Sequence, residues 1–362
     1  MFDSKKIRKE HKEKKSSGLA EGTLRSEKRA LDSLKRFCLA KESEGGYDES
    51  LESIIPKIKK DPDVVYDFID DFVKFEKKRQ RTNRYGVLIK DENGNTIPAI
   101  SINTLKLRFI YIRKFLDEEG IKLDKKSKVK EIFGKSEKHQ RIGVTHEQIE
   151  SLILASDRRM QAAIMIQSST GMRVGELRQI RIKDLEKLEF EGETRYKINI
   201  PAKITKTKTG RITFVSKEAE PYLEWLIKDR KPDDVILNLC QYSILVGFQR
   251  GVRKAELEKK YEHSTHNTIT SHSMRAFFIT QMGKVDGFFG HQMAGHSYNL
   301  DQYDRYTDEE KLEAYLKGEK HLQIFNRVNQ KQMKNLERQL EEQQKTIEIL
   351  QEQVLKTMVH VK

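Results

Sequence analysis

The sequence contains little cysteine, proline or tryptophan and has no long hydrophobic run. Its 362 residues include 2 Cys, 6 Pro and 1 Trp. The two cysteines, Cys38 and Cys240, are too few for a disulfide framework or for a zinc site built from cysteines. No stretch reaches the ~18 apolar residues that a membrane span needs, and the opening residues MFDSKKIRKE lack the apolar run of a signal peptide. We therefore expect an intracellular protein that is neither disulfide-stapled nor embedded in a membrane.

Positive charge is in excess and is unevenly spread. Lys and Arg number 70 against 56 Asp and Glu, which gives a formal net charge of +14. Residues 1–15 hold seven basic residues against three acidic ones, and residues 121–145 hold eight against three. Residues 201–217 hold five basic residues and no acidic one. Most charge runs are solvated surface, but three such tracts beside ordered-looking segments favour a clamp around a phosphate backbone.

The length suits about two domains with tails. We expect a mainly α-helical chain with five parts. These are a basic tail over residues 1–20, a helical domain over 21–121, a basic linker over 122–143, a second domain over 144–325 and a C-terminal helix over 326–362.

Apolar periodicity predicts the helices of the first domain. One stripe begins near residue 21, a second follows Asp61-Pro62, and a third runs from Ser101 to Leu116. Between the last two, residues 85–100 predict a β-hairpin that turns at Asn93-Gly94.

The second domain is expected to combine helices with a small sheet. Thr145 heads an amphipathic helix, and another helix runs from Met160 to Ser169. The segments 188–190, 196–200 and 212–216 predict a three-stranded antiparallel meander, after which helices return.

The C-terminal segment carries an apolar heptad pattern with Gln343 at one apolar position. Two interpretations stay open: a coiled coil, or a single amphipathic helix folded onto its own domain.

Several common sites are missing from the sequence. There is no phosphate-binding loop ending in GKT or GKS and no GxGxxG after a strand. His263 and His266 form HxxH without a further ligand at metal-site spacing, and no acidic cluster suggests a two-metal nuclease. We therefore expect no cofactor and no metal.

Four segments of the second domain carry basic and hydrogen-bonding residues in a distinctive order. They are TGMRVGEL with Arg173 and Glu176, KITKTKTG before a strand, HSMR with His272 and Arg275, and AGHSYNLDQYDRYT with His296, Tyr303 and Tyr306. Each segment alone is unremarkable, since an Arg at a helix start is usually a surface ion pair.

In this order the segments resemble the tyrosine recombinases, the phage-integrase-like family, and in particular its archaeal, Xer-like members. The resemblance covers roughly residues 145–325, and the first domain looks like the SAM-like core-binding domain of that family. It implies a two-domain fold with an α-rich catalytic domain carrying a small antiparallel sheet.

The resemblance also implies roles for individual residues in breaking a phosphodiester bond. Arg173 and Arg275 would hold the non-bridging oxygens of the phosphate through forked hydrogen bonds. Lys206 would protonate the leaving 5′ oxygen, and Tyr303 would form a 3′-phosphotyrosyl link.

Three further residues have supporting roles in this interpretation. His272 would act as a general acid or base, and His296 would hydrogen-bond the phosphate. Glu176 would orient Arg173 or His272.

Three assignments have alternatives. Lys208 lies on the same turn as Lys206, and His291 in a second GH dipeptide competes with His296. Tyr306 competes with Tyr303, which family spacing favours when it is counted back from Thr307, the expected cap of the next helix.

The implied function is site-specific DNA recombination that integrates or excises a mobile element. Xer-like dimer resolution and a catalytically silent DNA-binding regulator are the alternatives, and the residues also suit a topoisomerase-like relaxing activity. The implied partners are double-stranded DNA, further copies of the chain in a tetramer, and accessory DNA-bending proteins. The implied location is the cytoplasm, at the nucleoid.

Overall fold

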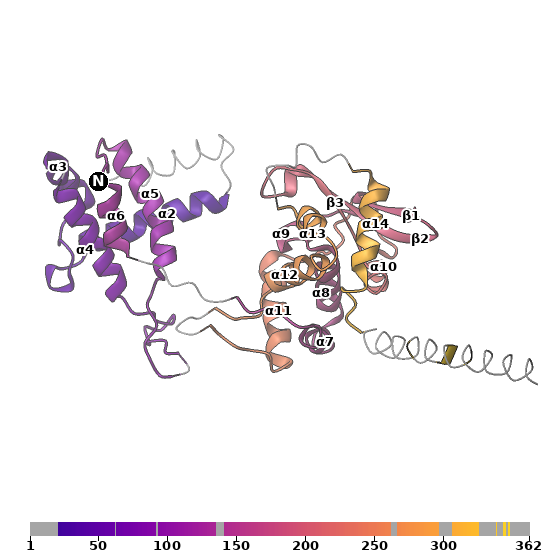
Figure 1. Ribbon diagram of the computed structural model, residues 1–362. Helices are drawn as coiled ribbons and strands as arrows, with labels where there is room; N and C mark the ends of the chain where they lie inside the picture. Colours follow the sequence, from indigo (N-terminus) through magenta and orange to yellow (C-terminus); the bar gives the residue numbers. More distant parts are fainter. Residues whose placement is uncertain are drawn as a thin grey trace, which may run out of the picture. The chain divides into compact units, whose positions relative to one another are not determined.

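The computed structural model describes residues 21–61, 63–91, 93–134, 141–261, 266–296 and 306–325, with Arg338, Gln343, Gln344 and Ile347 as single residues (Figure 1). The chain divides into two compact units, one formed by residues 1–140 with 261–266 and the other by 141–260 with 267–362. The basic tail over 1–20 and most of the heptad segment lie outside the described residues.

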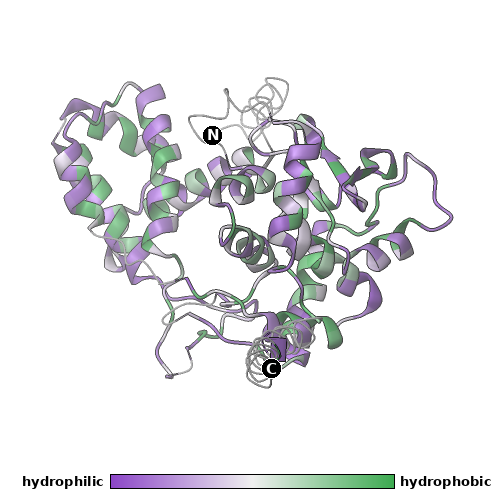
Figure 2. Cartoon of the chain, turned by 45° about the vertical axis from the view of Figure 1, so that its right-hand side comes forward, coloured by the Kyte–Doolittle hydropathy of each residue, from purple (hydrophilic) through white to green (hydrophobic). Residues whose placement is uncertain are grey.

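The first unit is a helical bundle. Its elements are α2 (Glu21–Leu39), η1 (Glu42–Glu44), α3 (Leu51–Lys60), α4 (Val64–Lys78), α5 (Ile102–Glu118) and α6 (Lys126–Phe133). Aromatic rings fill its centre, with Phe37 packed against Phe68 and Phe72 at centroid distances of 5.4 and 5.6 Å. In Figure 2 these helices carry hydrophobic residues on one side and hydrophilic residues on the other, as burial of one face requires.

The predicted hairpin has its turn where the sequence places it but lacks regular strands. The side chain of Asp91 accepts hydrogen bonds from the backbone N–H groups of Asn93 and Asn95, and Gly94 has φ +81°. Among the described residues, the two flanks of this turn form one isolated antiparallel bridge, Lys90 with Thr96, and further isolated bridges join Thr82 with Leu88 and Gln80 with Pro98.

Part of the segment predicted as a linker over residues 122–143 is helical instead. α6 forms within it, and Leu123 and Phe133 are buried in the core of the first unit. The ring of Phe133 lies 4.8 Å from that of Phe109 on α5, so this apolar contact ties the lysine-rich helix to the bundle.

The second unit is a helical domain with one small sheet. Its helices are α7 (His146–Leu154), α8 (Arg158–Thr170), α9 (Val174–Leu177), α10 (Glu220–Ile227), α11 (Gln241–Lys254), α12 (Ser271–Met282), α13 (Gly287–Ala294) and α14 (Asp308–Glu319), with η2 (Ile182–Asp184) and η3 (Ala202–Ile204). Its strands are β1 (Leu185–Phe190), β2 (Glu193–Ile200) and β3 (Arg211–Phe214), antiparallel in the order β1-β2-β3. The predicted mainly α-helical fold with a three-stranded meander is confirmed.

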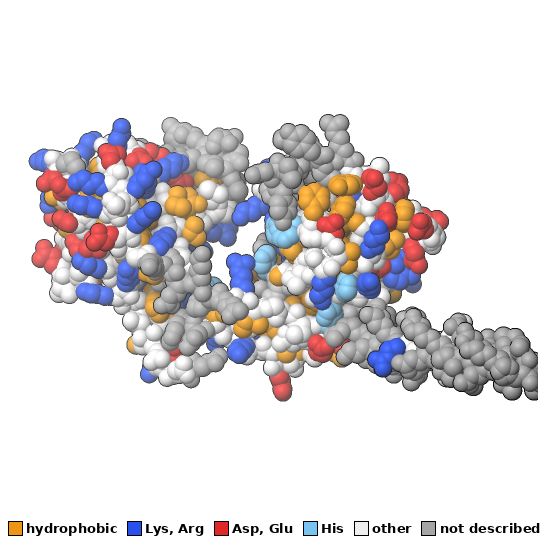
Figure 3. All heavy atoms as spheres, viewed as in Figure 1, with side chains coloured by type: hydrophobic (Ala, Val, Ile, Leu, Met, Phe, Trp, Pro, Cys, Tyr) orange, Lys and Arg blue, Asp and Glu red, His pale blue; other side chains and the backbone are white. Residues whose placement is uncertain are grey.

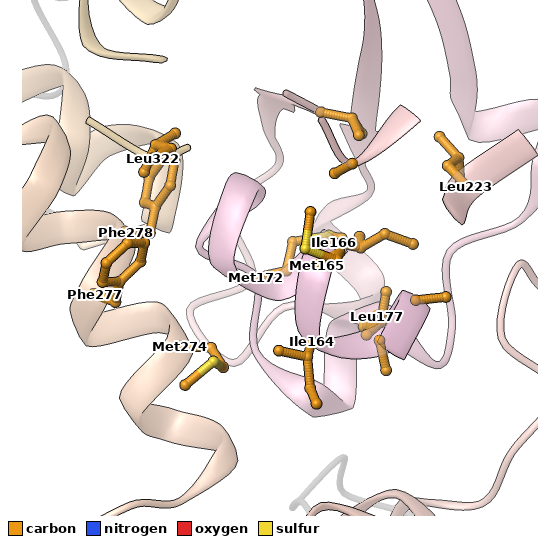
Figure 4. Packing of buried hydrophobic residues seen from close by; sticks show 14 of the residues in the cluster. Ile164, Met165, Ile166, Met172, Leu177, Leu223, Met274, Phe277, Phe278 and Leu322 are labelled. Carbon is orange, nitrogen blue, oxygen red and sulfur yellow. The ribbon is translucent and has the colours of Figure 1, made fainter. Parts of the chain in front are cut away.

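α8 forms the centre of this unit. All of its residues from Ala162 to Thr170 are buried, and it packs against α7, α10, α12 and β3. Figure 4 shows Ile164, Met165 and Ile166 of α8 in the hydrophobic cluster. Because α8 is buried on all sides, the turn that follows it is held firmly in place. None of the helices in the described part of the chain has the length and hydropathy of a membrane span.

Candidate active site

The TGMRVGEL segment forms a tight turn between α8 and α9. Gly171 ends α8 in the left-handed conformation, with φ +66°, which glycine adopts without a steric penalty. The chain then turns sharply, so that Arg173 becomes the N-cap of α9 and Glu176 lies in its first turn. The short helix α9, which follows the turn at Gly171, therefore places the side chains of Arg173 and Glu176 in contact.

Glu176 is a buried carboxylate that holds two arginines. Its side chain is 2% exposed. Arg173 Nη1 donates to Oε1 at 2.9 Å, and Arg211 Nη2 at the start of β3 donates to Oε2 at 2.6 Å. Burial by itself raises the pKa of Glu176, but the hydrogen bonds and charges of Arg211 and Arg173 outweigh it and hold the pKa below its ordinary value. Glu176 is therefore ionised at neutral pH. Among the described residues, its hydrogen-bond partners are Arg173 and Arg211.

Arg275 on α12 is a buried cation that has no carboxylate partner among the described residues. Its Nη1 donates to the carbonyl oxygen of Gly171 at 2.8 Å and to that of Ala294. Its Nε and Nη2 are buried, and no residue in the described part of the chain accepts a hydrogen bond from them. Burial, and then the charges of Arg173 and Arg211, lower the pKa of Arg275 to about 9. Such a group is costly unless an anion accepts its remaining hydrogen bonds.

A cavity of about 500 Å³ brings most of the expected site residues together. Its walls include Arg173, Glu176, Lys206, His272 and Arg275. Lys208, the alternative to Lys206, also lines this cavity, with φ +59°. The two lysines lie on the loop between η3 and β3, so the geometry does not separate them.

His272 and Arg275 lie one turn apart on α12 and face the same cavity. Partial desolvation and the charges of Arg275, Arg141 and Arg173 lower the pKa of His272 below its ordinary value. A neutral imidazole at pH 7 can accept a proton, which suits the role expected for this residue.

His296 follows α13 and lines a neighbouring cavity of about 230 Å³ together with Arg211. Its Nδ1 lies 2.8 Å from Nδ1 of His291, so the two candidates for one role are in direct contact. Desolvation, then Arg275 and His291, lower the pKa of His296 to about 4. His296 is therefore neutral at pH 7. Figure 3 shows histidine side chains on the visible face of the second unit.

Of the two tyrosines proposed as nucleophile, the structure describes Tyr306. Tyr303 lies outside the described residues. Tyr306 is 45% exposed, and its ring packs at 5.0 Å on Phe289 and 6.5 Å on Phe288, with neither cavity including it in its walls. Thr307, from which the family spacing to the tyrosine is counted, caps α14 through a capping box with Glu310.

Two residues of this site had no role in the sequence interpretation. Arg211, which opens the third strand, shares Glu176 with Arg173. His291 was recognised only as a competitor of His296, although the two are partners. The spacing of five residues across the end of α13 is the one signal that could have suggested a histidine pair.

A mainly helical domain of this form, with its three-stranded sheet, has the fold of tyrosine recombinase catalytic domains. Residues 143–313 of the second unit match the model of the phage integrase family. Its similarity to a structure of a lambda integrase dimer bound to a COC′ core site has a TM-score of 0.52 at 13% identity, covering 85% of this chain and 100% of that one.

A lambda integrase tetramer bound to a Holliday junction matches with a TM-score of 0.51 at 13% identity, covering 83% of this chain and 79% of that one. A structure of the XerA recombinase matches with a TM-score of 0.34 at 16% identity, covering 86% of this chain and 96% of that one. At these identities the likeness concerns the fold. Among the curated proteins, none matches the sequence.

Proposed function

We propose that the protein is a tyrosine-type site-specific recombinase that cleaves and rejoins duplex DNA. The observation that carries this proposal is the buried guanidinium of Arg275, which lines a cavity together with Arg173 and whose Nε and Nη2 have no hydrogen-bond partner among the described residues. A phosphodiester offers the oxygen acceptors and the negative charge that this cation lacks. The phage integrase family domain over residues 143–313 supports the same conclusion.

The residues around the cavity suit each step of such a reaction. Arg173 and Arg275 would stabilise the charge that develops on the non-bridging oxygens as a tyrosine oxygen attacks phosphorus. Neutral His272 would accept the tyrosine proton, and Lys206 would give a proton to the leaving 5′ oxygen. His296 would donate a hydrogen bond to the phosphate. The resulting 3′-phosphotyrosyl bond conserves the energy of the phosphodiester, so rejoining needs no nucleotide cofactor.

Tyr303 is the proposed nucleophile. The capping box of Thr307 supports it, because that cap fixes the start of α14 and hence the point from which the family spacing is counted. The position of Tyr306 supports the same choice, since its ring packs on Phe289 and Phe288 and lines neither of the two cavities.

Integration or excision of a mobile element is the biological role we propose, with duplex DNA in the cytoplasm as substrate. The basic residues 1–15 and the C-terminal heptads are additions to a minimal Xer-like plan, and this favours an integrase over dimer resolution. An archaeal subtype rests on the sequence resemblance alone. Assembly of four copies on DNA, with accessory DNA-bending proteins, completes the proposal.

The decisive experiment is capture of the covalent intermediate. The full chain is mixed in EDTA with a library of nicked duplex half-sites, so that cleavage releases the short strand and traps the enzyme. Denaturing gels then show protein–DNA adducts, and mass spectrometry identifies the modified residue. We expect an adduct at Tyr303 that is lost in Tyr303→Phe and kept in Tyr306→Phe, because only the nucleophile needs its hydroxyl.

Other results would change the proposal in defined ways. An adduct at Tyr306 would keep the chemistry and overturn the choice of tyrosine. Tight DNA binding by the wild-type chain without any adduct would contradict the enzyme and favour a DNA-binding regulator.

A further inference from the structure

The contact between His291 and His296 restricts where protons can lie. The two Nδ1 atoms are 2.8 Å apart, which is hydrogen-bond distance, and the ring centroids are 5.0 Å apart. One Nδ1 must therefore donate and the other must accept. A state in which both rings are cations would place two N–H groups head to head, so it is excluded while the contact exists.

Charges around His296 restrict its state further. The groups that act on its ring are Arg275, His291, Arg173 and His272, and Arg211 and Lys311 line the same cavity. Every one of these is a cation or an imidazole. Because desolvation and then this field disfavour a positive charge on His296, the ring is neutral at pH 7 and carries a single N–H.

A neutral histidine can donate to a phosphate only through that one N–H. With Nδ1 of His296 engaged by His291, Nε2 is the nitrogen available to a ligand. If His291 donated nothing, His296 could place its proton on Nδ1 and present a lone pair to the anion, which would repel it. The orientation of the proton between the two rings therefore decides whether His296 helps or hinders the proposed reaction.

We propose that His291 is a positioning residue: its Nδ1–H donates to Nδ1 of His296, which fixes His296 as the Nε2–H tautomer and aims that N–H at the scissile phosphate. This inference rests on the proposed recombinase function and deepens it. It assigns a role to the second GH dipeptide, Gly290-His291, which the family motif leaves without one. α13 provides the rigid support, since Asp286 caps its first turn by accepting from the N–H groups of Phe288 and Phe289.

The tautomer can be measured without any DNA cleavage. In the full chain labelled with ¹⁵N-histidine, long-range proton–nitrogen correlations distinguish Nε2–H from Nδ1–H, and the variant His296→Phe assigns the signals. We expect His296 to be the Nε2–H tautomer in the wild type and to become a mixture in His291→Phe, which keeps ring volume without a donor. In His291→Asn the side-chain amide can replace the Nδ1–H, and we expect the tautomer to be kept.

Adduct formation then tests the consequence. We expect His291→Phe to slow cleavage by roughly tenfold or more, as loss of a tautomer-fixing partner does in other enzymes, and His291→Asn to recover most of the rate. In a His296→Phe background, His291→Phe should add less than about a twofold loss, because His291 acts through His296.

Three results would overturn the inference. They are an Nδ1–H tautomer of His296 in the wild type, a tautomer unchanged in His291→Phe, or an equal rate loss from His291→Phe with and without His296. Failure of the wild type to form any adduct would instead count against the recombinase function, and the nitrogen signals would still decide whether His291 fixes His296.

Discussion

Glu176 determines how much uncompensated positive charge the cavity holds. One carboxylate is shared by Arg173 and Arg211, while Arg275 donates to backbone carbonyl oxygens. The cavity therefore keeps a net positive charge whose positions are fixed. Fixed cations of this kind stabilise a developing negative charge without reorganising during the reaction.

Replacing Glu176 with Gln should destabilise the protein by roughly 2 kcal/mol at pH 7, because Arg173 and Arg211 lose the anion that accepts their hydrogen bonds. The pKa of Glu176 lies below its ordinary value of 4.5, so its carboxylate stabilises the folded state fully above about pH 4.5. That contribution is lost as the pH falls through the folded-state pKa. Denaturant unfolding of the wild type and Glu176→Gln should therefore show a difference in the free energy of unfolding that is constant from pH 7 to about pH 4.5. Below that pH the difference should become smaller.

Glu313→Gln is a matched control. Glu313 pairs with Lys317 at 2.6 Å on the surface of α14, with side chains 41% and 62% exposed. Its loss should cost less than about 1 kcal/mol, because exposed ion pairs contribute little. An equal effect of the two substitutions would contradict the role given to Glu176.

At the level of residues, the sequence predicts the cavity better than it predicts the contacts inside it. Arg173, His272 and Arg275 follow from short motifs, because each motif lies on one turn or one helix. The contact of Arg211 with Glu176 joins residues 35 positions apart and depends on how β3 packs, so no local pattern reveals it. The same holds for the carbonyl oxygens of Gly171 and Ala294 that orient Arg275.

Among the elements, the turn from α8 into α9 controls the site. A methyl group at Gly171 would lie 2.4 Å from Cδ1 of Phe278, and φ +66° already disfavours a side chain there. The carbonyl of the same glycine accepts from Arg275. The packing of α8 on α12 and the position of the Arg275 guanidinium therefore both depend on Gly171.

Gly171→Ala should lower the free energy of unfolding by roughly 1–3 kcal/mol through backbone strain and overpacking. It should also slow adduct formation, since moving the carbonyl moves Arg275. Gly175→Ala is the control within the same motif: nothing lies within 4 Å of its added methyl group, and it is a position inside α9. That change should be neutral or slightly stabilising. A larger loss from Gly175→Ala than from Gly171→Ala would refute this account.

Local signals predicted the elements that depend on local chemistry. Ser101, Thr145 and Thr307 cap α5, α7 and α14 as their sequences indicate. α6 was missed because its lysine-rich sequence gives a weak apolar pattern, and it is held by the tertiary burial of Phe133. The hairpin kept its turn at Gly94 but formed only isolated bridges.

At the scale of the whole molecule, we expect the excess of positive charge to attract an anion only where cations outnumber their acidic partners. In the first unit, Arg36, Arg79 and Arg108 converge on the fully buried Glu76 at 2.7, 3.0 and 3.6 Å. Three cations around one anion leave about two positive charges beside a cavity of about 780 Å³, which Arg36 and Arg79 line. Lys57 by contrast forms a one-to-one pair with Glu49.

The contrast between Arg36, in a cluster with surplus positive charge, and Lys57, in a one-to-one pair, predicts that Arg36 contributes more to binding a DNA backbone. Arg36→Gln and Lys57→Gln each lower the net charge by one, from +14 to +13. Arg36→Gln leaves Glu76 its other two arginines, so the unit should stay folded. If the Arg36 cluster contacts a phosphate, the slope of log Kobs against log salt concentration should fall by about 0.9 in Arg36→Gln and stay unchanged in Lys57→Gln. The slope is measured by fluorescence anisotropy of the full chain on one duplex. Equal changes in the two variants would mean that binding follows the overall charge of the chain, and the cluster around Glu76 would then be a feature of folding alone.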